Sequence, residues 1–190
     1  MSLKMSILGL VSYKPMTGYD IYKLFDGSLK FFFAAQQSQI YRELNDLEKI
    51  GFVSARREEQ ESRPTRKIYS ITQEGEAALF DWLVDYSEEP HFSQRLPYLT
   101  KIFFAAKIPD EELLKSILRF RELAKAKLGK LETSYANADA FINSFQLPKD
   151  DFFYWELTID YGLRIFQMNI DWADRAIGLL ESRIAAANAD

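Results

Sequence analysis

The first fifty residues contain three segments in which apolar side chains recur every three or four positions. Their apolar positions are Leu3, Ile7, Leu10 and Val11 in the first, Ile21, Leu24 and Phe25 in the second, and Ile40, Leu44 and Leu47 in the third. Pro15 separates the first two segments, Gly27 ends the second and Gly51 ends the third. This spacing predicts three consecutive helices, each with one buried side.

The pattern changes after Gly51. Residues 52–60 and 66–72 favour strands, and the polar residues 61–65 between them are typical of a hairpin tip. Thr72 can then cap a fourth helix. Three helices followed by a β-hairpin is the order of a winged helix-turn-helix, in which the hairpin forms the wing.

The second half of the chain is expected to be helical. The polar stretch around Pro90 predicts a boundary between a DNA-binding domain, residues 1–86, and a helical domain, residues 92–190. Two helices are expected before the last one, the second opening at Pro109. The predicted fold class is mainly α (α+β), an N-terminal winged helix-turn-helix with a β-hairpin wing followed by a C-terminal helical dimerisation arm.

The last helix carries a heptad pattern. Its seam consists of Ile159, Leu163, Phe166, Ile170, Ala173, Ile177, Leu180 and Ile184. Such a repeat favours helix pairing, and we expect it to join two copies of the chain. Ile165, Trp172 and Leu179 form a second seven-residue series that makes the apolar face wider than a two-stranded seam requires. The alternative is a helix bundle within one chain.

Composition removes several function classes. The 190 residues include no cysteine and one histidine, His91, which is expected in the linker between the domains. A thiolate zinc site, a cysteine nucleophile and a multi-histidine metal site are therefore impossible within one chain, and we expect no metal, no cofactor and no enzyme activity. The polar N-terminus and the lack of a long apolar run predict a cytoplasmic protein that does not enter a membrane.

The start of the third helix carries the chemistry of DNA recognition. Its candidate DNA-binding residues are Gln36, Gln37, Ser38, Gln39, Tyr41 and Arg42. Amides can pair with adenine and arginine can reach guanine or phosphate, and the reading helix of a helix-turn-helix presents its first residues to the major groove. The alternative is an ordinary solvated helix face.

The hairpin supplies the densest group of cations. Arg63, Arg66 and Lys67 lie around its tip, and two further arginines precede them. A wing is placed to contact phosphate or the minor groove, so these three residues are DNA-binding candidates despite a net charge of −4 for the whole chain. The alternative is a charged edge that discourages strand pairing.

Several motifs of the N-terminal half resemble one family. They are Ile7-Leu8-Gly9-Leu10, Thr17-Gly18-Tyr19-Asp20-Ile21, Gln39-Ile40-Tyr41-Arg42-Glu43-Leu44, Leu47-Glu48-Lys49-Ile50-Gly51-Phe52-Val53 and Arg63-Pro64-Thr65-Arg66-Lys67-Ile68-Tyr69-Ser70-Ile71-Thr72. Together they resemble the PadR family of bacterial transcription regulators. The C-terminal half, with Leu157-Thr158 and Trp172-Ala173-Asp174, is similar to the larger-armed subfamily that includes AphA.

The resemblance implies a homodimer that binds double-stranded DNA at an inverted repeat, usually as a repressor, with its C-terminal helices exchanged between subunits. It places Thr17 and Tyr19 at the start of the helix that positions the reader, and adds them to the DNA-binding candidates. Family members often respond to a small aromatic effector, whereas the AphA-like branch contains activators.

A second function remains open from the sequence. The arm is rich in aromatic residues, so the protein could act mainly as a small-molecule sensor or a protein-interaction module. Trp155, Tyr161 and Trp172 are the candidate pocket residues. The alternative for these rings is a place in the core of the dimer.

Overall fold

The computed structural model describes residues 2–31, 35–60, 63–85 and 96–188, with only the backbone described at residues 2, 59–60 and 63–65. His91 lies outside the described residues. The chain forms two compact units: Met1–Glu89 with Asp139–Lys149, and Pro90–Ala138 with Asp150–Asp190.

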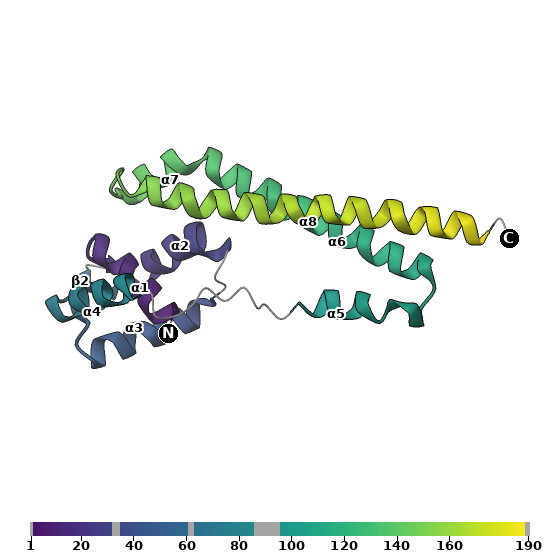
Figure 1. Ribbon diagram of the computed structural model, residues 1–190. Coiled ribbons are helices and arrows are strands. Elements are labelled where there is room, and N and C mark those ends of the chain that lie inside the picture. Colours follow the sequence, from purple (N-terminus) through teal and green to yellow (C-terminus); the bar gives the residue numbers. More distant parts are fainter. Residues whose placement is uncertain (1, 32–34, 61–62, 86–95, 189–190) are drawn as a thin grey trace. The chain divides into compact units, whose positions relative to one another are not determined.

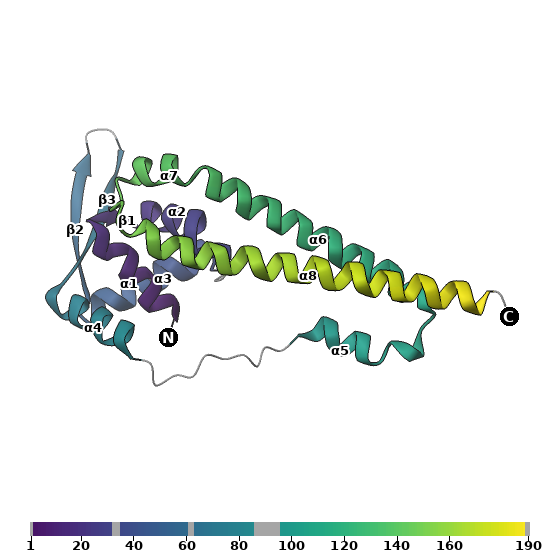
Figure 2. The same cartoon turned by 45° about the horizontal axis from the view of Figure 1, so that its top comes forward.

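The first unit contains the predicted helices and hairpin (Figures 1 and 2). Its elements are α1 (Ser2–Tyr13), β1 (Met16–Thr17), α2 (Gly18–Ser28), the short 3-10 helix η1 (Leu29–Phe31), α3 (Gln37–Lys49), β2 (Val53–Gln60), β3 (Arg63–Ile71) and α4 (Gln73–Val84). This order confirms the winged helix-turn-helix. The β2–β3 hairpin is called the wing below.

The helices of the first unit share one apolar core. Ile7 and Leu8 of α1, Ile21 of α2, and Ile40 and Leu44 of α3 have no exposed surface. Because the three helices bury their stripes in the same place, each must turn its polar side outward.

A small antiparallel sheet completes this unit, in the strand order β1-β3-β2. Val53 pairs with Ile71 at the base of the wing, and Met16 of β1 pairs with Tyr69. The two-residue strand β1 was not predicted, because a segment this short has no periodicity and depends on a partner some fifty residues away.

A further helix, α7 (Ala138–Phe145), was also not predicted. It belongs to the first unit with the residues that follow it, up to Lys149. Ile142 and Leu147 are buried, the Phe141 ring lies against Gly27 of α2, and the Lys14 ammonium donates a hydrogen bond to the Phe145 carbonyl. The sequence had assigned this segment to the arm, and the division into DNA-binding residues 1–86 and arm residues 92–190 stays a prediction.

The second unit is helical. It contains α5 (Pro97–Phe103), η2 (Ala105–Lys107), α6 (Asp110–Ala136) and α8 (Phe152–Ala187). Three polar contacts join α6 and α8: Asp110 accepts from Arg183 at 2.7 Å, Arg121 donates to Asp174 at 2.9 Å, and the Tyr135 hydroxyl donates to Glu156 at 2.7 Å. Partner numbers fall along α8 as they rise along α6, so the two helices are antiparallel, as Figures 1 and 2 show.

Part of the heptad seam of α8 packs within its own chain, and pairing of two chains through this seam stays a prediction. Ala173 and Ile177 form a buried cluster with Ile117 of α6, and Ile170 is also buried. Leu131 of α6 lies close to Gly162. The other seam residues, Ile159, Leu163, Phe166, Leu180 and Ile184, are half-buried. The α6 helix of the same chain thus covers the middle of the seam.

None of the helices within the described ranges is long and apolar enough to cross a membrane.

The packing of α7 on α2 depends on Gly27, which leads to a first prediction. Gly→Ala inside a helix normally stabilises it by about 0.5–1 kcal/mol. At Gly27, however, the added Cβ would lie 2.2 Å from the Phe141 ring. We expect Gly27→Ala to loosen α7, so that backbone amides of residues 139–149 exchange with deuterium at least severalfold faster.

Gly129→Ala on α6 is the matched control, because a Cβ there meets nothing within 4 Å. It should raise the unfolding midpoint and leave exchange in 139–149 unchanged. Equal exchange in both variants would show that Phe141 moves aside without releasing the helix.

Candidate nucleic-acid interface

The N-terminus of α2 is closed by a reciprocal cap. The Thr17 hydroxyl accepts a hydrogen bond from the Asp20 amide at 3.2 Å and donates to the Asp20 carboxylate at 2.6 Å. Thr17 therefore fixes the start of α2. Tyr19, the next candidate, is about half exposed, with the Lys23 ammonium 4.9 Å from the centre of its ring.

Gly18 allows α2 and α3 to approach each other. A Cβ on Gly18 would lie 2.5 Å from the Tyr41 ring, so only glycine fits beside this ring without movement. Tyr41 remains partly exposed. The first turn of α2 therefore lies directly beside the exposed side of α3.

The reading helix α3 is anchored by its apolar side. Ile40, Leu44 and Leu47 have no exposed surface. Gln37, Ser38, Tyr41 and Arg42 are exposed on other sides of the same helix, and Gln36 is exposed at the position before it. The structure thus brings most of the candidate reading residues together on a solvent-facing surface.

Gln39 differs from its neighbours. Its side-chain oxygen accepts a hydrogen bond of 2.7 Å from the Gln36 amide, and it is half-buried. This bond satisfies one of the amides that a helix start leaves without an intrahelical partner. Gln39 therefore closes the N-terminus of α3, a role that spacing alone did not indicate.

The wing carries both exposed cations and a cation that is paired with α3. Arg56, Arg57 and Arg66 are exposed. Lys67, in contrast, donates a hydrogen bond to Glu48 of α3, with 2.5 Å between Nζ and Oε2. Arg63 lies in β3, but its side chain is outside the described part. The sequence treated Arg66 and Lys67 as equivalent, because no local signal pairs a hairpin residue with one 19 positions earlier.

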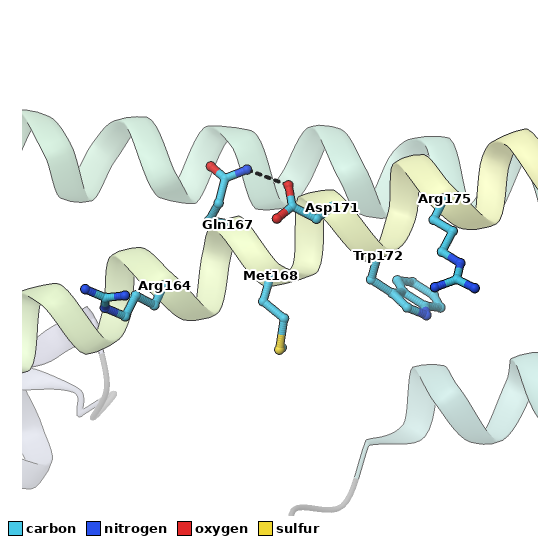
Figure 3. A pocket seen from close by; sticks show the side chains of 6 residues that line it. All are labelled: Arg164, Gln167, Met168, Asp171, Trp172 and Arg175. Atoms are coloured by element: carbon cyan, nitrogen blue, oxygen red, sulfur yellow. Dashed lines mark hydrogen bonds between the residues drawn. The ribbon is translucent and has the colours of Figure 1, made fainter.

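A hollow lies on the arm, along α8. Its volume is about 490 Å³, and it is lined by Arg164, Gln167, Met168, Asp171, Trp172 and Arg175. Met168 and Trp172 project from the same side of α8, and the Arg175 guanidinium lies beside the indole (Figure 3). Of the three candidate pocket residues, Trp172 lines this hollow, whereas Trp155 and Tyr161 are not among its lining residues.

Trp172 also belongs to the core of the arm. Its ring meets the Phe120 ring edge-on with centroids 5.6 Å apart, and Phe120 stacks on Tyr98 at 4.5 Å. One side of the indole is thus held by packing while another borders the hollow. An effector pocket and a place in the core of a dimer both stay predictions for this ring.

An anchored helix with an exposed polar N-terminal surface, next to a basic hairpin, defines a winged-helix DNA-binding protein. Residues 7–81 match the transcriptional regulator PadR-like family, and residues 94–181 match the C-terminal region called virulence activator alpha. The chain belongs to the PadR-like family of transcriptional regulators, with a C-terminal arm of the AphA type.

Two relatives illustrate the match. The negative transcriptional regulator PadR of Bacillus subtilis is 29% identical over 182 residues, which cover 94% of this chain and 97% of that protein. Its crystal structure with operator DNA superimposes with a TM-score of 0.80, covering 95% of this chain and 99% of that one at 29% identity. The virulence activator AphA of Vibrio cholerae gives a TM-score of 0.73 at 28% identity, covering 96% and 99%.

Proposed function

We propose that this chain binds an inverted-repeat operator as a homodimer and represses transcription from it. The observation that carries the proposal is the exposed polar surface at the start of α3, a helix whose orientation is fixed by three fully buried residues. Amides and hydroxyls at this position suit the edges of bases in the major groove. The similarity to Bacillus subtilis PadR, whose crystal structure contains operator DNA, supports binding to an operator.

The charge distribution supports phosphate contacts by the wing. The chain as a whole is acidic, with a net charge of −4, so non-specific attraction to DNA must come from a local surface. The exposed Arg56, Arg57 and Arg66 provide such a surface on the hairpin. These contacts would set orientation on the duplex, while α3 would read the sequence.

The second apolar side of α8 supports homodimerisation. Its exposed residues are Tyr154, Leu157, Tyr161, Met168 and Leu179. At about 100° per residue they fall in one stripe on the side away from the seam that packs on α6. From Tyr154 to Leu179 this stripe extends for about 38 Å at 1.5 Å per residue. Monomeric proteins rarely leave so long an apolar surface in water, and we propose that a second copy covers it.

We further propose that the arm, residues 92–190, binds a small aromatic effector. The hollow on α8 combines the Trp172 indole with the guanidinium groups of Arg164 and Arg175. An aromatic ring can stack on the indole while a carboxylate pairs with an arginine. The crystal structure of Bacillus subtilis PadR with p-coumaric acid, 27% identical over 94% of this chain and 98% of that one with a TM-score of 0.76, supports this class of ligand.

The family also supports proposals about catalysis and cellular location. Its members are transcriptional regulators, and we propose a binding role without catalysis for this chain. Because such a protein acts on the bacterial chromosome, we propose a cytoplasmic location.

The assignment of α3 as the reading helix predicts an effect of Gln37→Ala. Footprinting on DNA upstream of the gene should show protection of an inverted repeat. Gln37→Ala should relax the preference at one base pair per half-site, because a bidentate contact discriminates by about 1–3 kcal/mol. The measurement is the affinity for single-base operator variants.

Gln73→Ala is the matched control, since Gln73 is exposed and occupies the first position of α4 as Gln37 does in α3. It should bind all operator variants as the wild type does. If Gln37→Ala keeps the wild-type preference at every position, Gln37 does not read bases.

The stripe on α8 predicts that charge will separate the subunits. Leu157→Glu combined with Leu179→Glu would place carboxylates in an apolar interface, where an unpaired charge is strongly unfavourable. We expect a monomer in sedimentation velocity and at least a tenfold loss of operator affinity at the same protein concentration, since each half-site would be bound separately. Lys130→Glu, an exposed charge change on α6, should leave the dimer intact. If the double variant still sediments as a dimer, the subunits do not associate through this stripe.

The hollow predicts quenching of tryptophan fluorescence by an aromatic acid. Addition of p-coumaric acid should quench the wild-type emission and lower operator affinity severalfold. Trp172→Phe should abolish most of the quenching, while Trp82→Phe, on α4, should retain it. Equal quenching in the two variants would exclude the hollow as the binding site.

A further inference from the structure

The ammonium of Lys67 is held by two groups of its own unit. It donates a hydrogen bond to Glu48, near the C-terminal end of α3, and both side chains are just over one-third exposed. The same nitrogen lies 5.1 Å from the centre of the Tyr69 ring, a distance that permits a cation–π contact. The Lys67 ammonium therefore contacts both the Glu48 carboxylate and the Tyr69 ring.

The Tyr69 ring beside Lys67 is held in place by the sheet. Tyr69 is 3% exposed, and its backbone lies between Ala55 of β2 and Met16 of β1 in the sheet. The hydrogen bond to Glu48 raises the pKa of Lys67, while burial acts in the opposite direction. Lys67 is therefore charged at neutral pH.

The pair joins the wing to the reading helix at a distance from the hairpin base. At the base, the Phe52 amide donates to the Leu47 carbonyl and the Thr72 hydroxyl donates to the Gly51 carbonyl. Lys67 lies opposite Arg57, four ladder positions beyond the Val53–Ile71 pair, or about 14 Å along the strand. On its other edge β3 is held by β1, at Ile68 and Tyr69, and the Glu48–Lys67 contact adds a direct connection between this part of the wing and α3.

Arg66 provides the contrast within the same strand. Successive side chains of a strand point to opposite faces, so Arg66 and Lys67 face different surroundings. Arg66 is exposed and makes no ion pair with any side chain in the described part of the chain. Its charge is available to a phosphate, whereas that of Lys67 is already neutralised by Glu48.

We propose that Lys67 is a positioning residue that, with Glu48, fixes the wing against the reading helix, and that it is not one of the cations that neutralise DNA phosphate. The inference rests on the proposed DNA-binding function. It changes the role of Glu48 as well: this acid, which alone would repel DNA, strengthens binding by holding the wing.

The dependence of binding on salt separates the two roles of a lysine. A phosphate contact releases counterions, so its loss reduces the slope of log K against log salt by about 0.9 per contact. A positioning residue changes affinity without this reduction. The probe is a duplex selected by the wild-type protein from a randomised library, and binding is measured over a series of salt concentrations.

We expect Arg66→Met to reduce the slope by about 0.9 for each bound subunit. Lys67→Met should weaken binding severalfold and keep the wild-type slope. Glu48→Gln should also weaken binding, although it removes a negative charge. A slope reduction by Lys67→Met equal to that of Arg66→Met, tighter binding by Glu48→Gln, or unchanged affinity of Lys67→Met would each overturn the inference.

The reversed pair, Glu48→Lys with Lys67→Glu, keeps the contact and the net charge and guards against a variant that fails to fold. It should bind more tightly than Lys67→Met, with a slope near that of the wild type. If Lys67 contacts phosphate, an acid in its place will instead bind more weakly than Lys67→Met. Failure of the wild type to bind any duplex would refute the proposed function itself, a result distinct from all of these.

Discussion

Burial of one side of α3 is the constraint on which the surface of the first unit depends. Ile40, Leu44 and Leu47 are fully buried, so rotation of the helix about its axis would expose apolar area at a cost of about 25 cal/mol per Å². The orientation of every polar side chain on α3 follows from this. Ser38 and Arg42 face solvent because they lie on the side of α3 away from Ile40, Leu44 and Leu47.

Burial of its apolar side determines the orientation of α3, and three further contacts fix its N-terminus and its position relative to α2 and the wing. Gly18 lets the start of α2 approach the Tyr41 ring, and Gln39 closes the N-terminus of α3. Glu48 then connects the far end of α3 to the wing through Lys67. Each of these contacts is polar or depends on a missing Cβ, so each fixes geometry more than it adds stability.

The periodic parts of this structure could be predicted from the sequence, since apolar spacing is a local property. The three N-terminal helices, the wing and the long last helix follow from it. Spacing does not say which neighbour covers an apolar side, so the sequence could not show that Ala173 packs against Ile117 of α6 in the same chain. The docking of α7 through Phe141 on Gly27 had no local signal either, because the two residues are more than a hundred positions apart.

The same limit applied to the candidate site. Composition and position identified the polar start of α3 and the basic wing, but they could not separate a cation that is free from one that is paired. Arg66 and Lys67 are adjacent in sequence and alternate in direction along β3, so their surroundings differ completely. Only the packing of the wing beside α3 brings Glu48 to Lys67.

The width of the apolar surface on α8 has a physical explanation once its two sides are considered separately. The side with Ile170, Ala173 and Ile177 is buried by α6, whereas the side with Leu157 and Leu179 is exposed. A helix that needed only one partner would carry charged residues on the second side. Two apolar stripes on one helix favour two neighbours: α6 is one of them, and the proposed second copy of the chain is the other. A dimer built on the second stripe would leave the packing of α6 on α8 intact, so folding of the arm and association of two arms use different surfaces of the same helix.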